Sequence, residues 1–134
     1  MTTDYALRCM LYLAEKDCLS SSVEIGKAVG LNKIFAQKVL RVLRDAGLVY
    51  SEYGSNGGYR LAKRPDEIVL LDVIILFEKT MKINSCLEPE GYCNRNETCP
   101  MHAYYAEIQN ILEGFFGKDT LQDIINHKKQ ERRQ

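Results

Sequence analysis

Three cysteines lie close together in one polar stretch of the chain, and their spacing is the strongest chemical signal in the sequence. Cys86, Cys93 and Cys99 are separated by six and five residues, and His102 follows three residues after the last cysteine. Three thiols in one flexible loop can converge on a single metal centre. The gaps exceed the two-residue gap of a zinc knuckle, and longer gaps suit a larger object. The spacing therefore favours an iron–sulfur cluster in loop 84–102.

Such a cluster takes four protein ligands, and the loop supplies only three cysteines. A fourth ligand of another residue type would leave one iron with a weaker, more replaceable bond, where oxygen, nitric oxide or cluster loss could act. His102 is the local candidate for that ligand. Three other interpretations of these residues stay open: a zinc ion bound by three cysteines and the histidine, thiols that oxidise reversibly, and cysteines without a chemical role.

The remaining composition is that of a globular protein that stays in the cytoplasm. The chain has 134 residues, of which 46% are hydrophobic and 27% charged. It has no signal-peptide pattern at its start, and no apolar run approaches the roughly 20 residues that span a bilayer. Five cysteines are an odd number, and the expected compartment is reducing, so a disulfide framework is a poor explanation for them. Cys9 is expected in the core, while Cys18 lies at a helix end.

The charge is unevenly distributed, although the net charge of the whole chain is zero. Residues 1–66 carry ten Lys or Arg and seven Asp or Glu, a net charge of +3, and residues 67–134 carry eight and eleven, a net charge of −3. Seven basic residues lie between Lys33 and Arg64, against Asp45 and Glu52. A local basic stretch is sufficient for contacts with the phosphates of a nucleic acid.

The elements ahead of the cysteine loop are predicted by their caps and their periodicity. A first helix covers residues 5–14, where apolar positions recur at helical spacing. Ser21 and Glu24 have the spacing of a capping box, which starts a second helix that ends at Gly30. Asn32 is the expected N-cap of a third helix. The second and third helices are expected to face inward through Val23, Ile25, Ala28, Val29, Phe35, Val39, Val42, Leu43 and Ala46.

The order of elements predicts a winged helix. The turn at residues 30–32 joins two short helices, which is the helix-turn-helix arrangement. A strand pattern over 48–53, a glycine-rich turn over 54–58 and a returning strand over 59–62 then form the wing. The fold class is therefore mostly α with a small β-hairpin.

The second region is predicted to be helical around the cysteine loop. A helix over 70–80 precedes the loop, and a long helix over 101–116 follows it. Thr120 and Asp123 cap a last short helix. We expect residues 1–66 to form the DNA-binding region, and residues 67–134 to complete the same compact domain.

Polar side chains on the third helix are the candidate readers of DNA bases. Its exposed face can enter the major groove, where glutamine pairs with adenine and lysine with guanine. Arg41 and Arg44 suit phosphate contacts or salt bridges. In the wing, Gly57 and Gly58 let the backbone approach phosphate, and Arg60 or Tyr53 suits the minor groove. The candidate readers are Asn32, Lys33, Gln37 and Lys38.

The same charges also fit a solvated helix face, and only their combination with the wing and the basic stretch favours DNA. No enzyme motif competes with this interpretation. The sequence has no evident pair of catalytic carboxylates or nucleophile with a base, and the 54–58 turn lacks the strand-to-helix context of a phosphate-binding loop.

Taken together, the chain resembles the family of iron–sulfur winged-helix regulators typified by IscR and NsrR, from Thr3 to about Ile125. The resemblance rests on three motifs: Thr3–Arg8, Leu43–Val49 running into Gly54–Leu61, and the three-cysteine loop. It implies a homodimer held by the long helix near residues 103–116, a DNA operator as the partner, and a cluster on the three cysteines. Tyr53 stands where the family often has an arginine, and the first cysteine gap differs slightly from the cluster-biogenesis type.

The resemblance offers two choices for the fourth ligand. In the cluster-biogenesis type it is a histidine three residues after the last cysteine, here His102. In the nitric-oxide type it is an aspartate from the first helix region of the other subunit, here Asp4. Both residues are present, so the cluster type, [2Fe–2S] or [4Fe–4S], stays open. Relatives without a cluster sense cysteine supply by binding a biosynthetic enzyme, so a cluster-free regulator with a metabolic-enzyme partner is the alternative function.

Overall fold

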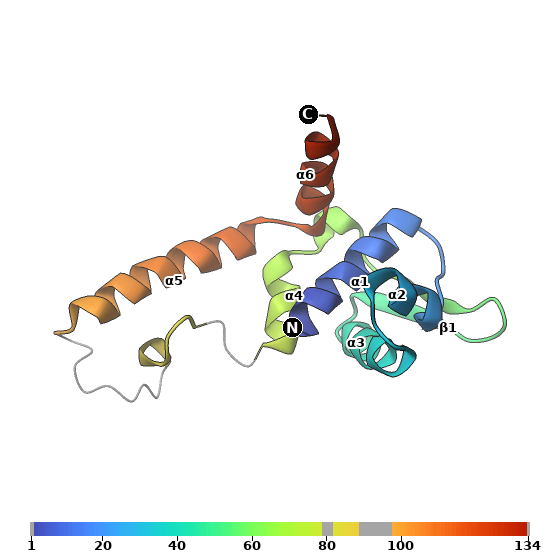
Figure 1. Ribbon diagram of the computed structural model, residues 1–134, viewed down its shortest axis with the longest axis horizontal. Helices are drawn as coiled ribbons and strands as arrows, with labels where there is room; N and C mark the ends of the chain where they lie inside the picture. Colours follow the sequence, from blue (N-terminus) through green and yellow to red (C-terminus); the bar gives the residue numbers. More distant parts are fainter. Residues whose placement is uncertain (1, 79–81, 89–97, 134) are drawn as a thin grey trace.

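A winged-helix body and a long projecting helix make up the computed structural model, which describes residues 2–78, 82–88 and 98–133, without the side chains of 85 and 128–133. Helix α5 projects from the body, and α6 packs against the body (Figure 1). The predicted fold class is confirmed. The elements in order are α1 (Thr2–Lys16), α2 (Ser22–Val29), α3 (Lys33–Asp45), β1 (Val49–Glu52), β2 (Gly58–Leu61), the 3₁₀ turn η1 (Pro65–Glu67), α4 (Leu70–Phe77), the 3₁₀ turn η2 (Ser85–Leu87), α5 (Pro100–Lys118) and α6 (Leu121–Arg133).

Side-chain caps set the turn between α2 and α3. Ser21 Oγ accepts a hydrogen bond from the Glu24 backbone N–H at 3.1 Å, and Asn32 Oδ1 accepts one from the Phe35 N–H at 3.0 Å. Gly30 ends α2 in the left-handed region, with φ of 82°. These contacts satisfy backbone donors that a helix start leaves unpaired. The predicted caps of the helix-turn-helix are confirmed.

The core lies between α1, α3, the hairpin and α4. On α3 the buried face is formed by Ala36, Val39, Leu40 and Leu43, which recur at helical spacing. Phe35 is 55% exposed, so the prediction that it faces inward is wrong. Val23 and Val42 are also more exposed than predicted, and Ala28 and Ala46, likewise predicted to face inward, are exposed. The buried stripe of α3 runs along one side only, and its partners on α1 are Ala6, Cys9, Met10 and Leu13.

The wing is held against the body by a third extended segment. β1 and β2 pair antiparallel, with Tyr50 opposite Arg60. Ser20 then pairs with Tyr59 on the other side of β2 through hydrogen bonds of 3.0 and 2.8 Å in both directions. A Cβ at Gly58, whose φ is 155°, would meet Ser20 O at 2.5 Å, which is why glycine is needed there. The wing is therefore fixed relative to α2.

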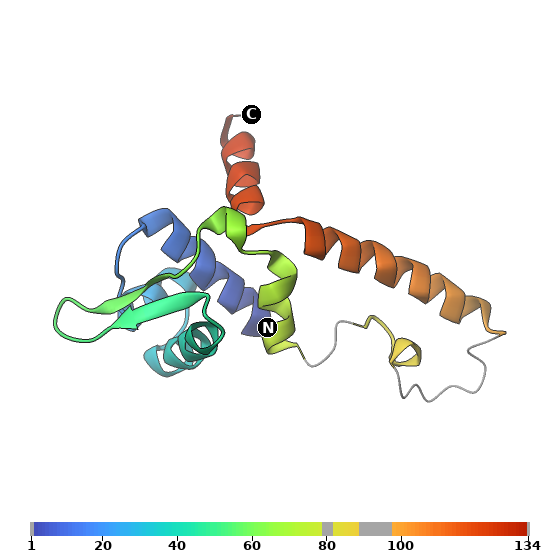
Figure 2. The ribbon, with the colours of Figure 1, turned by 180° about the vertical axis from the view of Figure 1, so that it is seen from behind.

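The junction of α5 and α6 is fixed to the body, while the other end of α5 projects from it (Figure 2). Leu70 N–H donates to Asp119 O at 3.0 Å, and Leu121 N–H donates to Ile68 O at 2.9 Å. The predicted cap of the last helix is present, because Thr120 N–H donates to Asp123 Oδ2 at 2.8 Å. α4 ends at Phe77 and α5 continues to Lys118, so the predicted bounds at Thr80 and Phe116 are corrected. In the part of the chain that the structure describes, no helix is long and apolar enough to span a membrane.

Candidate DNA-binding face and cysteine loop

The first two turns of α3 present a mixed basic and apolar surface. Lys33 and Lys38 are exposed, and Lys38 Nζ lies 5.6 Å from the centre of the Phe35 ring. Ile34 is 66% exposed beside them. Polar and apolar groups can both read base edges, since thymine presents a methyl group in the major groove. Ile34 was not among the predicted readers, and Phe35 was predicted inside, although two adjacent large apolar residues in the first turn of a helix were a signal that one of them lies outside.

The other predicted readers on α3 occupy different environments. Exposed Asn32 uses its side-chain oxygen as the cap, which leaves its amide N–H₂ as a donor for another partner. Gln37 is half-buried and Arg41 is exposed. Arg44 Nε lies 3.6 Å from Asp45 Oδ1, which fits the salt-bridge alternative stated for it. The structure thus places Lys33 in the first turn of α3, Lys38 in the second turn and Arg41 about one turn further along.

The wing carries one very exposed aromatic side chain and one engaged arginine. Tyr53 is 94% exposed next to the turn. Arg60 Nη2 donates to Asp17 Oδ1 at 3.1 Å, and this hydrogen bond is the main cause that raises the pKa of the arginine. A Cβ at Gly57 would collide with the Glu52 carbonyl. Gly57, Gly58 and Arg60 therefore each have a structural role, and their contact with DNA stays a prediction.

The described part of the cysteine loop brings two cysteines to elements that touch. Cys86 lies on η2, Cys99 is the N-cap residue of α5, and η2 packs against α5. Both thiols are half-buried. Cys93 lies outside the described residues, and among those described no three His, Cys, Asp or Glu side chains form a metal-binding group.

His102 has an unsatisfied ring nitrogen. It lies one turn after Cys99 on α5, and its Nδ1 is buried without a hydrogen-bond partner among the described residues. A buried polar atom of this kind is costly unless something binds it. A metal ion or cluster held by the adjacent cysteine is one such partner, because neutral imidazole is a common metal ligand. The residues present therefore fit the predicted metal centre.

Asp4 is not brought to the cysteines within one chain. It lies on α1 in the body and pairs with Arg8 Nε at 3.0 Å. Cys99 and His102 begin α5, whose first turns are at the end that projects from the body (Figure 1). The two predicted choices for the fourth ligand thus stand on separate parts of the molecule.

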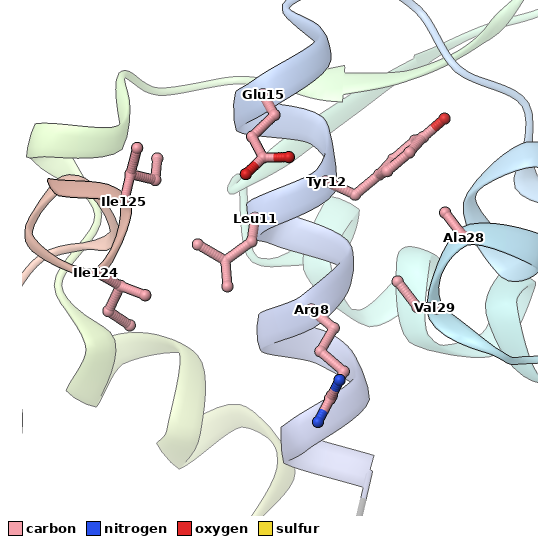
Figure 3. Close-up of a pocket in the computed structure, with 8 residues that line it drawn as sticks. All are labelled: Arg8, Leu11, Tyr12, Glu15, Ala28, Val29, Ile124 and Ile125. Atoms are coloured by element: carbon pink, nitrogen blue, oxygen red, sulfur yellow. The ribbon is translucent and has the colours of Figure 1, made fainter. Parts of the chain in front are cut away.

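A hollow of about 290 Å³ opens between α1, α2 and α6. Figure 3 shows Leu11, Val29 and Ile124 directed into it, with Arg8 and Glu15 on the α1 side. None of the residues that line it is a cysteine or histidine. The hollow is therefore separate from the candidate metal centre.

One face of α5 exposes a regular apolar stripe. Ile111 is 66% exposed and Phe115 is 61% exposed, and half-buried Ile108 continues the row. The stripe reads Met101, Tyr104, Ile108, Ile111 and Phe115. Alternating steps of three and four residues are the pattern of a helix seam that packs against another helix.

The fold and these surfaces define a winged-helix DNA-binding protein. The chain belongs to the Rrf2 family, described as an iron-dependent transcriptional regulator, whose profile matches residues 1–127. The expected resemblance to the family of IscR and NsrR is confirmed, since regulators with both names are among its relatives.

Individual relatives match over nearly the whole chain. A helix-turn-helix-type transcriptional regulator of Aquifex aeolicus is 36% identical over 128 residues, which cover 93% of this chain and 89% of the relative. The regulator NsrR of Halalkalibacterium halodurans is 32% identical, with 94% and 88% covered. Among solved structures, the global cysteine regulator CymR of B. subtilis superposes with a TM-score of 0.77 at 27% identity, covering 95% of both chains.

Proposed function

We propose that this chain is a homodimeric transcriptional regulator whose DNA affinity is set by an iron–sulfur cluster on Cys86, Cys93 and Cys99. The observation that carries the proposal is the contact of η2 with α5, which puts half-buried Cys86 and Cys99 on touching elements, with the unsatisfied Nδ1 of His102 one turn after Cys99. When bound, the cluster would supply an iron that reacts with nitric oxide or oxygen or is lost when iron–sulfur supply falls. The protein's own residues hold it, and loop 84–102 carries its state to α5.

The first two turns of α3 are the proposed reading surface for the major groove. Lys33, Gln37 and Lys38 would contact base edges together with Asn32, and Arg41 would contact phosphate. Exposed Ile34 and Phe35 suit the methyl groups of thymine. The wing, through Gly57, Gly58 and Arg60, would lie along the adjacent phosphates. Residues 1–66 thus form the DNA-binding region.

A second copy of the chain is the proposed partner of α5. The stripe that includes Ile111 and Phe115 is apolar, regular and exposed along the projecting helix. In an isolated chain the stripe is exposed to water, whereas in a dimer the two stripes would bury each other. The dimer also lets residues 67–134 of one chain meet the body of the other. This arrangement is needed if Asp4 of the partner subunit is the fourth ligand. Such a regulator works in the cytoplasm on its DNA operator.

A cluster-free regulator is the second candidate function. The likeness to CymR, a protein named for cysteine regulation, favours it. In this case Cys86 and Cys99 would act as thiols that oxidise, or would hold zinc with His102, or a metabolic enzyme would be the signal partner. Either version keeps the DNA-binding face of α3.

The deciding experiment is the absorption spectrum of protein purified without oxygen, with iron and acid-labile sulfide measured on the same sample. We expect a brown protein with near-equal iron and sulfide. Substituting Asp4→Ala and His102→Ala in turn then identifies the fourth ligand by the change in spectrum. Colourless protein without iron and sulfide, even after reconstitution, would reject the cluster and leave the zinc, thiol or enzyme-partner versions.

A further inference from the structure

Gln109 is the one residue of α5 that is fully buried among those described, and it is polar. Its side chain is 3% exposed in the middle of a helix whose other described residues are half-buried or exposed. Burying an amide is costly unless its donors and acceptor are satisfied. Gln109 Oε1 accepts a hydrogen bond from the Ile83 backbone N–H at 2.8 Å, and Nε2 donates to Glu113 Oε1 at 3.1 Å. The burial is therefore tied to specific contacts.

The same carboxylate also holds the neighbour of Ile83. Lys82 Nζ donates to Glu113 Oε1 at 3.1 Å, so this oxygen receives hydrogen bonds from both Lys82 and Gln109. These bonds, first that from Lys82, hold the pKa of Glu113 below its ordinary value, so the carboxylate is charged at neutral pH. Gln109 and Glu113 on α5 thus form hydrogen bonds with Lys82 and Ile83, two successive residues of the segment that leads from α4 to η2. Cys86 follows Ile83 by three residues.

Gln109 and Glu113 lie on the face of α5 that also carries His102. Residues 102, 106, 109 and 113 recur at steps of four, three and four, so they share one side of the helix. At about 100° per residue, the apolar stripe with Ile111 and Phe115 lies nearly opposite. The segment that leads to Cys86 and the proposed dimer interface consequently contact different faces of α5.

From these contacts we infer that Gln109 is a positioning residue for the metal centre. By fixing the segment that leads to Cys86, Gln109 holds this thiol against the face of α5 that carries Cys99 and His102. The inference rests on the proposed function for the identity of the bound group. Gln109 touches no ligand atom itself. It restricts the backbone at Ile83, which lowers the conformational entropy that the loop would lose on binding a metal or cluster.

The contacts with Ile83 and Glu113 depend on residue 109 being a glutamine. Its amide supplies one acceptor for the Ile83 N–H and one donor for the Glu113 carboxylate, which no apolar side chain of similar length can do. Methionine has nearly the same volume and flexibility, so Gln109→Met removes the hydrogen bonds and keeps the packing. Asn110, the next residue, is exposed, so Asn110→Met is a matched control for added apolar surface.

The test compares wild type, Gln109→Met and Asn110→Met in three measurements. Amide hydrogen exchange at Ile83 and the alkylation rate of Cys86 by iodoacetamide, resolved by peptide mass spectrometry, are measured on metal-free protein. The rate of cluster loss to a chelator without oxygen is measured on reconstituted protein. For Gln109→Met we expect faster exchange at Ile83, faster alkylation of Cys86 and cluster loss accelerated by roughly tenfold, the low end of the effect of changing residues that support metal ligands. Asn110→Met should match wild type in all three.

The outcomes separate this inference from the proposed function. If exchange at Ile83 is unchanged in Gln109→Met, Gln109 does not restrain the Ile83 backbone. If exchange is faster but Cys86 alkylation and cluster loss are unchanged, Gln109 has no positioning role. If wild type takes up no cluster, the proposed function fails, and the two metal-free measurements still decide whether Gln109 positions Cys86. Glu113→Gln changes only the charge at a partly exposed site, so it provides a second variant should Gln109→Met not fold. It should shift the same measurements in the same direction by a smaller factor.

Discussion

Arg60 Nη2 donates a hydrogen bond to Asp17 Oδ1 at 3.1 Å, which ties the wing strand β2 to the end of α1. Asp17 has a φ of 47°, unusual for a residue other than glycine. This conformation places the carboxylate at the turn that leads to Ser20, which itself pairs with β2. The wing is therefore positioned by α1 and by the following segment together, and a residue predicted to contact DNA is engaged within the protein.

This pair gives a prediction for DNA binding. If Arg60 acts through Asp17, then Arg60→Met and Asp17→Asn should weaken binding to a similar extent, and the double variant should be little worse than either. If Arg60 instead neutralises a phosphate, only Arg60→Met should reduce the salt slope of log K, by about 0.9. Fluorescence anisotropy at several salt concentrations separates the two results. Lys63→Met, in the same segment, serves as a control for the general loss of a positive charge.

Ile34 should contribute to sequence preference through thymine methyl groups. The DNA sites are those that the wild-type protein selects from a random library. Replacing a contacted thymine by deoxyuridine removes one methyl, which should cost about 0.8 kcal/mol, roughly fourfold in affinity. In Ile34→Ala the same replacement should cost much less. An equal cost in both proteins would show that Ile34 does not contact that methyl.

The apolar stripe of α5 should hold the dimer. Ile111→Glu places a charge in the centre of the stripe, where it would be desolvated by a second copy. We expect this variant to sediment as a monomer at micromolar concentration, while Asn110→Glu, on a different side of α5, stays dimeric. A dimeric Ile111→Glu protein would move the interface elsewhere. Circular dichroism checks that both variants keep their helices.

The cysteines outside the loop should differ sharply in reactivity. Burial raises the pKa of the Cys9 thiol to about 12, so almost none of it is thiolate at pH 8. Cys18 is exposed. In a variant with Cys86, Cys93 and Cys99 replaced by serine, a chromogenic disulfide reagent should titrate one thiol rapidly in the folded protein and a second only on unfolding. Rapid reaction of both thiols would mean that α1 does not bury Cys9.

Asp123 should stabilise α6 in a pH-dependent way. The Thr120 backbone N–H, and then its hydroxyl, hold the pKa of Asp123 below its ordinary value of 3.8. A lowered pKa means that the charged cap contributes stability at neutral pH, and that this contribution is lost as the pH falls below that value. Asp123→Asn should therefore lower Tm at pH 7. The difference from wild type should shrink towards pH 3, as followed by thermal unfolding.

Much of this protein was determined by short-range signals in the sequence. The caps at Ser21 and Asn32, the glycine at the end of α2 and the turn of the wing each depend on a few neighbouring residues, and their physics is complete within one helical turn or one hairpin. The order of these elements was sufficient for the winged-helix prediction. The cysteine spacing likewise indicated a metal centre, because ligand type and loop length are local properties.

Tertiary packing decided which faces of these elements are exposed and which distant residues meet. Periodicity predicted Phe35 inside, but α3 packs through the stripe that contains Ala36 and Leu40, so Phe35 faces out. Arg60 reaches Asp17 across 43 residues of sequence, and Gln109 reaches Ile83 across 26. No local pattern marks Gln109, since a glutamine on an amphipathic helix is normally exposed. It is buried because the segment leading to Cys86 crosses α5 at that turn and supplies the backbone hydrogen bond that a buried amide needs.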